Sequence, residues 1–127
     1  MQYSDRSRKR LVFQEAMSMS EKKVIVYNKL VRDRIPEIIG ESGKSCVTKI
    51  LEDDEYIKML DSKLDEELAE YHKDQNIEEL ADLMEVIRAC AMARGYSLQE
   101  LEEIRRQKAE ERGAFSDRIM LIEVKTK

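Results

Sequence analysis

The stretch EELAEYHKDQNIEELAD, residues 66–82, contains one acidic motif twice, as EELAE at 66–70 and as EELAD at 78–82. Apolar residues recur at helical spacing on both sides of the polar residues 74–76. We therefore predict two antiparallel helices joined at residues 74–76. The first is capped by Asp53 or Asp54 and runs to about residue 73, and the second is capped by Asn76 and ends before Gly95.

The remaining segments carry weaker structural signals. Pro36 suits the first turn of a short helix at 36–40, and Ser97 with Glu100 predicts a capping box for a third long helix at 98–112. Residues 23–31 read as extended, residues 45–51 as a weak strand, and residues 119–124 as a terminal strand or packed tail.

Composition favours an all-α fold. Charged residues make up 39% of the 127 and aromatic residues 6%, with no Trp, four Gly and one Pro, which is poor in the turn and aromatic residues of a β-sandwich. The helix after Asn76 is apolar over more than half of its circumference, which predicts burial on two sides. We therefore expect an antiparallel helical bundle completed by oligomerisation, as a homodimer or homotetramer, with minor short strands at its ends.

The formal net charge of −4 is unevenly distributed. Residues 1–23 hold six Lys/Arg and three Asp/Glu, which leaves 17 against 24, or −7, for the rest. We expect residues 1–20 to be a flexible basic arm or extension and residues 21–127 to be one domain. A nucleic-acid role for SRKR, residues 7–10, is a weak alternative because four residues carry little specificity.

The chain contains no apolar run of membrane-spanning length and no apolar core of a secretory signal at its start. Cys46 and Cys90 lie far apart in the sequence and form no CxxC motif. These features predict a cytoplasmic protein with reduced thiols and no membrane contact.

The acids of the repeated motif differ in their expected burial. At about 100° per residue, Glu67 lies within about 60° of the centre of its helix's apolar stripe and Glu70 near the edge, while Glu66 lies on the far side. Glu79 falls inside the apolar arc of the next helix and Asp82 at its margin. In an antiparallel pair, residues equidistant from the turn lie at one level, which pairs Glu70 with Glu79 and Glu67 with Asp82.

Four acids held close together destabilise a fold unless a cation lies between them. Each acid taken alone is better explained as a solvated helix face, and Glu79 could serve only the helix start after Asn76. Both pairs are centred on the same point in the sequence, between residues 74 and 75, so the four acids are expected to converge. This favours a site for Mg²⁺, with Mn²⁺ as an alternative, because these ions prefer oxygen ligands.

Two groups of basic residues could complement such a site. Arg105, Lys108 and Arg112 continue the apolar side of the third helix. They could reach phosphates held by the metal, or they could extend along the surface and favour the helix dipole. Residues 28–33, NKLVRD, could bind phosphates or simply form an arm that covers the bundle.

The combination EExxE and ExxD resembles the all-α nucleoside triphosphate pyrophosphohydrolases, the superfamily of MazG-like proteins, dimeric dUTPases and phosphoribosyl-ATP pyrophosphohydrolase. The flanking sequences NKLVRDRIPEII, residues 28–39, and Lys108-xxx-Arg112-Gly113-x-Phe115 are similar to a MazG-like, phosphoribosyl-ATP-pyrophosphohydrolase-like subgroup. The resemblance covers about residues 27–121. The link between the acidic halves is shorter here than in many members.

The resemblance implies a hydrolase that cleaves the bond between the α- and β-phosphates of a nucleotide and releases pyrophosphate. A non-catalytic nucleotide- or partner-binding module with the same fold is the alternative. Glu66 and Glu67 would be catalytic, with Glu66 orienting water. The implied Mg²⁺ ligands are Glu67, Glu70, Glu79 and Asp82; the implied phosphate ligands are Lys29, Arg32, Lys108 and Arg112, with Asn28 and Asp33 as further substrate contacts.

Overall fold

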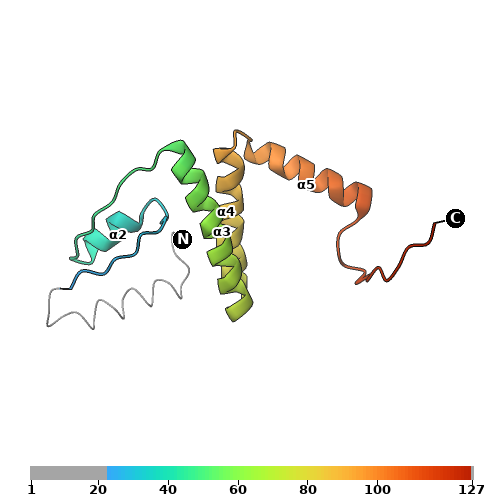
Figure 1. Cartoon of the computed structure of the whole chain (residues 1–127), viewed down its shortest axis with the longest axis horizontal. Coiled ribbons are helices and arrows are strands. Elements are labelled where there is room, and N and C mark those ends of the chain that lie inside the picture. The colour runs from blue at the N-terminus through green and yellow to red at the C-terminus, as the bar shows by residue number, and fades with distance from the viewer. Residues whose placement is uncertain (1–22, 127) are drawn as a thin grey trace.

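The computed structural model describes residues 23–126, and its regular structure is entirely helical (Figure 1). The expected arm at residues 1–20 lies outside the described residues. Along the chain follow α2 (Ile35–Glu41), α3 (Asp53–Asp74), α4 (Ile77–Ala93) and α5 (Leu98–Arg112). The predicted all-α class is confirmed, and the three long helices match their predicted positions closely.

A two-residue link makes α3 and α4 an antiparallel hairpin. Gln75 adopts a left-handed conformation (φ 52°) and its N–H donates to the Tyr71 carbonyl at 2.7 Å, which ends α3. The Asn76 side chain then accepts from the Glu79 N–H at 2.9 Å and starts α4. The predicted cap at Asn76 is confirmed, and the reversal lets the helices pack side by side.

The other helix ends follow the expected local chemistry, with one exception. Ser97 and Glu100 form the predicted capping box at the start of α5, and Gly95 after α4 has a positive φ of 91°. The predicted cap at Asp53 or Asp54 is wrong, because Glu52 occupies the cap position without a side-chain hydrogen bond. Both aspartates instead lie in the first turn, where negative charge favours the helix dipole.

The predicted strands are absent from the described residues. Segments 45–51 and 119–124 contain no strand, and the second of these is exposed rather than packed. Residues 23–31, which were predicted only to be extended, form neither a helix nor a strand. An extended segment becomes a strand only by hydrogen bonding to a neighbouring segment, and a single chain supplies no such neighbour here. Apolar, β-branched composition alone therefore overestimated strand content.

The apolar surface of α4 is only partly covered within one chain. Ile77, Leu80, Met84 and Ile87 form a stripe that is exposed in each case, with Met84 62% accessible. By helical geometry the centre of this stripe lies about 150° around α4 from Glu79 and Asp82. The acids therefore occupy the α3 side of the helix, and the exposed apolar stripe the opposite side.

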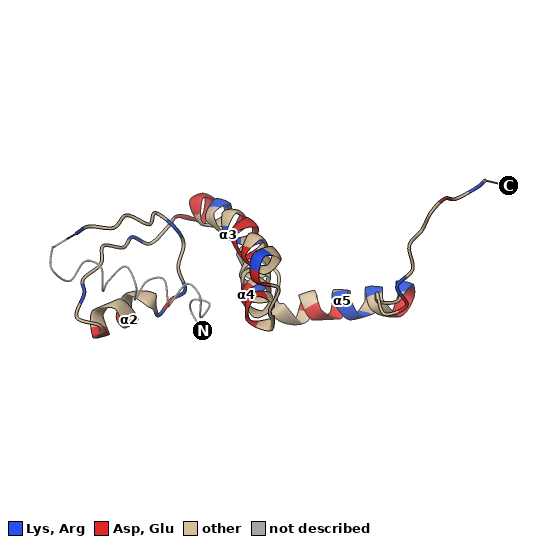
Figure 2. Cartoon of the chain, turned by 90° about the horizontal axis from the view of Figure 1, so that it is seen from below, with Lys and Arg blue, Asp and Glu red and all other residues tan. Residues whose placement is uncertain are grey.

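α5 follows the C-terminal end of α4, opposite the turn between α3 and α4, and extends away from α3 (Figure 1). Red and blue stretches alternate along it in Figure 2, in keeping with its many charged residues. Within residues 23–126, no helix combines the length and the apolarity that crossing a membrane requires.

Candidate metal centre

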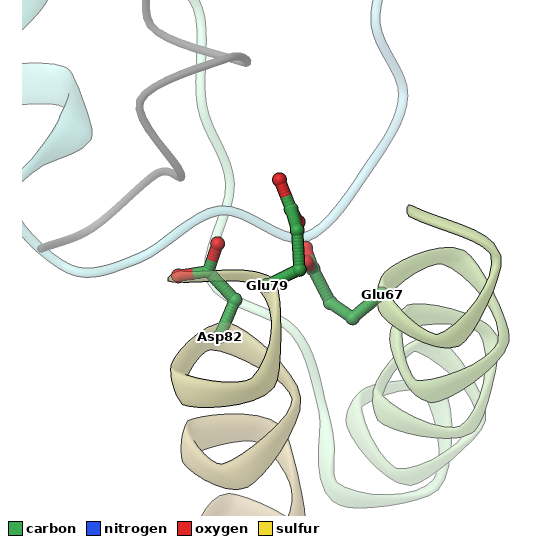
Figure 3. Close-up of side chains that lie close together, drawn as sticks. All are labelled: Glu67, Glu79 and Asp82. Carbon is green, nitrogen blue, oxygen red and sulfur yellow. The ribbon is translucent and has the colours of Figure 1, made fainter. Parts of the chain in front are cut away.

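Three carboxylates from α3 and α4 converge at the hairpin. Figure 3 shows Glu67 on α3 and Glu79 and Asp82 on α4, with their carboxylates on one side of the helix pair. One oxygen from each lies within 4.8 Å of the others. Their exposed fractions are only 8%, 1% and 5%. Burial of three acids at one point is the arrangement that a bound cation stabilises.

A second acidic group overlaps the first. Single oxygens of Glu70, Asp74 and Glu79 also lie within 4.8 Å of one another. The predicted levels are thus confirmed, since Glu67 groups with Asp82 and Glu70 with Glu79. Asp74 was read in the sequence only as part of the helix break, although it follows Glu70 by four residues and so lies on the same face.

Two cations contact two of the three buried acids. Arg32 Nη2 donates to Asp82 Oδ1 at 2.7 Å, across 50 residues of sequence. Lys63 Nζ lies 3.7 Å from Glu67 Oε1, one helical turn away. The i, i+4 spacing of Lys63 and Glu67 is visible in the sequence, but Lys63 was not among the predicted site residues.

Glu66 is closer to the site than its predicted outward direction allows. Its Oε1 lies 3.4 Å from Lys29 Nζ and its Oε2 3.3 Å from Lys63 Nζ, with 31% of the side chain exposed. The prediction that Glu66 faces away from the interior is wrong, because the segment preceding α2 adds Lys29 beside it. A pale-blue segment in Figure 3, in the colour of these early residues, passes next to the carboxylates.

The acids retain buried oxygen atoms. Among the described residues, Glu67 Oε2 and Asp82 Oδ2 are buried and have no hydrogen-bond donor. The Oε2 atoms of Glu70 and Glu79 are buried as well. A buried carboxylate oxygen without a donor is costly, whereas a divalent cation would satisfy several at once. The purely oxygen donor set fits Mg²⁺ or Mn²⁺ better than a metal that prefers sulfur or nitrogen.

Burial shifts the protonation of the site. Desolvation raises the pKa of Glu67, the charge of Lys63 partly opposes this, and nearby Asp82, Glu66 and Glu79 raise it further. Desolvation also raises the pKa of Asp82, against the charge and hydrogen bond of Arg32. Despite a short ion pair at Asp82, burial therefore dominates at both acids.

These shifts predict how pH affects the metal-free fold. Because the folded state binds protons at Glu67 and Asp82 more tightly than the unfolded state, their contribution stabilises folding as the pH falls through the raised pKa values. The gain is complete below the ordinary values of 4.5 and 3.8. We expect the difference in melting temperature between wild type and a Glu67→Gln/Asp82→Asn variant, measured with a chelator, to shift in favour of wild type on acidification. Parallel pH profiles would contradict this.

The structure brings only some of the predicted phosphate ligands to the acids. Lys29 and Arg32 contact Glu66 and Asp82, and the exposed Asn28 and Asp33 flank them. Lys108 and Arg112 lie on α5, which extends away from the hairpin, so one chain does not bring them to its own acids.

Comparison with known proteins gives one partial match. The chain is 63% identical over 41 residues to an uncharacterized protein of Mycolicibacterium smegmatis, which is 32% of this chain and 42% of that protein. The chain therefore spans less than half of that relative's length. No model of a known protein family and no solved structure matches the chain.

Proposed function

We propose that this chain is a Mg²⁺-dependent nucleotide pyrophosphohydrolase of the all-α, MazG-like type. It would cleave between the α- and β-phosphates of a nucleoside triphosphate, or of a phosphoribosyl-ATP-like substrate, to release a monophosphate and pyrophosphate. The single observation that carries the proposal is the set of acids buried between α3 and α4, with donor-free oxygens at Glu67 and Asp82.

The proposal assigns the ion to Glu67, Glu70, Glu79 and Asp82. These acids combine the EExxE and ExxD spacing with convergence across an antiparallel hairpin. A structural role alone would be served better by apolar residues, because buried like charges oppose folding. The bound ion would supply charge neutralisation of phosphate oxygens and activation of water.

The protein's own groups would then bind and orient the substrate. Glu66, which forms ion pairs with Lys29 and Lys63, would accept a hydrogen bond from an attacking water. Lys29 and Arg32 supply positive charge on the same side, where they would neutralise charge that develops on the leaving pyrophosphate. The depth of Glu67 and Asp82 excludes bulk water from the ligands themselves.

We propose in addition that the active form is a homodimer or homotetramer. The exposed stripe of Ile77, Leu80, Met84 and Ile87 on α4 supports this, because a wide apolar helix face is normally covered. A second copy would also provide a route by which Lys108 and Arg112 on α5 reach the acids of a neighbouring chain.

A substrate panel tests the activity. We expect one or more nucleoside triphosphates, or phosphoribosyl-ATP, to yield a monophosphate and pyrophosphate with Mg²⁺ and to yield neither with excess chelator. The products should be separated by chromatography, so that α–β cleavage is distinguished from release of inorganic phosphate. Binding of a nucleotide without turnover of any would instead support the non-catalytic module.

A further inference from the structure

Glu67 and Asp82 use their two carboxylate oxygens in the same way. Asp82 gives Oδ1 to Arg32 and keeps Oδ2 buried without a donor, and Glu67 places Oε1 near Lys63 and keeps Oε2 in the same condition. The acids come from different helices, and their cations come from different parts of the chain. One oxygen of each is therefore engaged by a cation of the protein, while the other remains available.

Both cations are themselves held in place. Arg32 lies three residues before Ile35, whose side chain is 2% exposed and whose N–H donates to the Arg32 carbonyl at 3.1 Å. This turn fixes the Arg32 backbone beside a buried anchor. Lys63 has only 11% of its side chain exposed and also contacts Glu66 at 3.3 Å.

We propose, on the basis of the function proposed above, that Arg32 and Lys63 are positioning residues that orient Asp82 and Glu67 as one-oxygen ligands of the divalent cation. Arg32 would hold the first oxygen of Asp82 by a hydrogen bond at 2.7 Å, and Lys63 would attract the first oxygen of Glu67 in an ion pair at 3.7 Å. In each case the second oxygen would be directed toward the ion. Groups that hydrogen-bond to metal ligands commonly contribute about 10- to 100-fold to metal affinity.

A positioning role and a competing role of Arg32 and Lys63 predict opposite changes in metal affinity. If Arg32 and Lys63 only neutralised the acids, they would compete with the divalent ion, and their removal would tighten its binding. If they position the ligands, their removal loosens it. The direction of the change in affinity therefore separates positioning from competition.

The experiment measures Mn²⁺ affinity of the full chain without nucleotide, from the electron paramagnetic resonance signal of free Mn²⁺. We expect Arg32→Gln to weaken binding by about 10-fold or more, Lys63→Gln to weaken it by a smaller factor, and Arg32→Lys to recover part of the loss. Arg34→Gln is the matched control. It removes the same positive charge two residues after Arg32, from a side chain that is exposed and paired with Glu37 at 2.9 Å. It should leave the affinity unchanged.

Unchanged or tighter Mn²⁺ binding in both Gln variants would overturn the positioning role while leaving the proposed activity intact. Absence of Mn²⁺ binding in the wild-type chain would instead overturn the proposed metal site itself. Circular dichroism shows whether each variant retains its helices. If Arg32→Gln unfolds, Lys63→Gln and Arg32→Lys decide the outcome, because Lys63→Gln leaves the Ile35 turn intact and Arg32→Lys keeps the positive charge.

Discussion

Replacing Glu67 by Gln, or Asp82 by Asn, is expected to reduce Mg²⁺-dependent pyrophosphate release by about 10³-fold or more. A bound metal ion contributes several kcal/mol to transition-state stabilisation, and about 1.4 kcal/mol corresponds to a factor of ten. The helices should survive, because each change replaces a buried charge by a neutral side chain of the same shape. We expect the metal-free variants to melt at the same temperature as wild type or a few degrees higher.

The matched control is Glu85→Gln, which makes the same chemical change on α4 at an exposed position. It should retain wild-type turnover. Chromatographic measurement of pyrophosphate and calorimetric melting with and without Mg²⁺ test both halves of the prediction. Wild-type turnover in Glu67→Gln and Asp82→Asn would reject the proposed ligands, and loss of helix content in both would assign the acids a structural role.

Replacing Met84 by Lys is expected to dissociate the proposed oligomer. Met84 lies at the middle of the exposed stripe on α4, between Leu80 and Ile87. A Lys side chain at the centre of a covered apolar interface would bury an unpaired charge, which typically costs about 2 kcal/mol or more, or about 30-fold or more in association. Light scattering across a concentration series measures the effect.

Glu85→Lys provides the control for this prediction. It changes the charge by more than Met84→Lys does, yet Glu85 lies about 120° around α4 from the stripe. We expect it to leave the molecular mass in solution unchanged. A monomeric wild type, or equal dissociation by both variants, would contradict the role of the apolar stripe.

Local sequence patterns predicted much of the fold. The polar break at residues 74–76, the Asn76 cap and the Ser97–Glu100 box depend on hydrogen bonds between near neighbours, so their geometry follows from a few consecutive residues. The convergence of Glu67 with Asp82 also followed, because a tight antiparallel turn sets which residues share a level.

Strands and side-chain directions were harder to predict. Residues 23–31, 45–51 and 119–124 have apolar content suited to strands, but pairing depends on a neighbour that no local pattern supplies. Glu66 was assigned to the far side of α3, and only the path of the preceding segment brings Lys29 to it.

By itself, the sequence determined the helices, their turn and the two levels at which the four acids pair, because helical periodicity and capping act over short distances. Only the tertiary structure decided that Arg32, 50 residues before Asp82, would bind one of its oxygens, and that Asp74 would join Glu70 and Glu79. Long-range contacts depend on how separate segments pack, and packing balances burial against charge over the whole chain rather than within any one stretch.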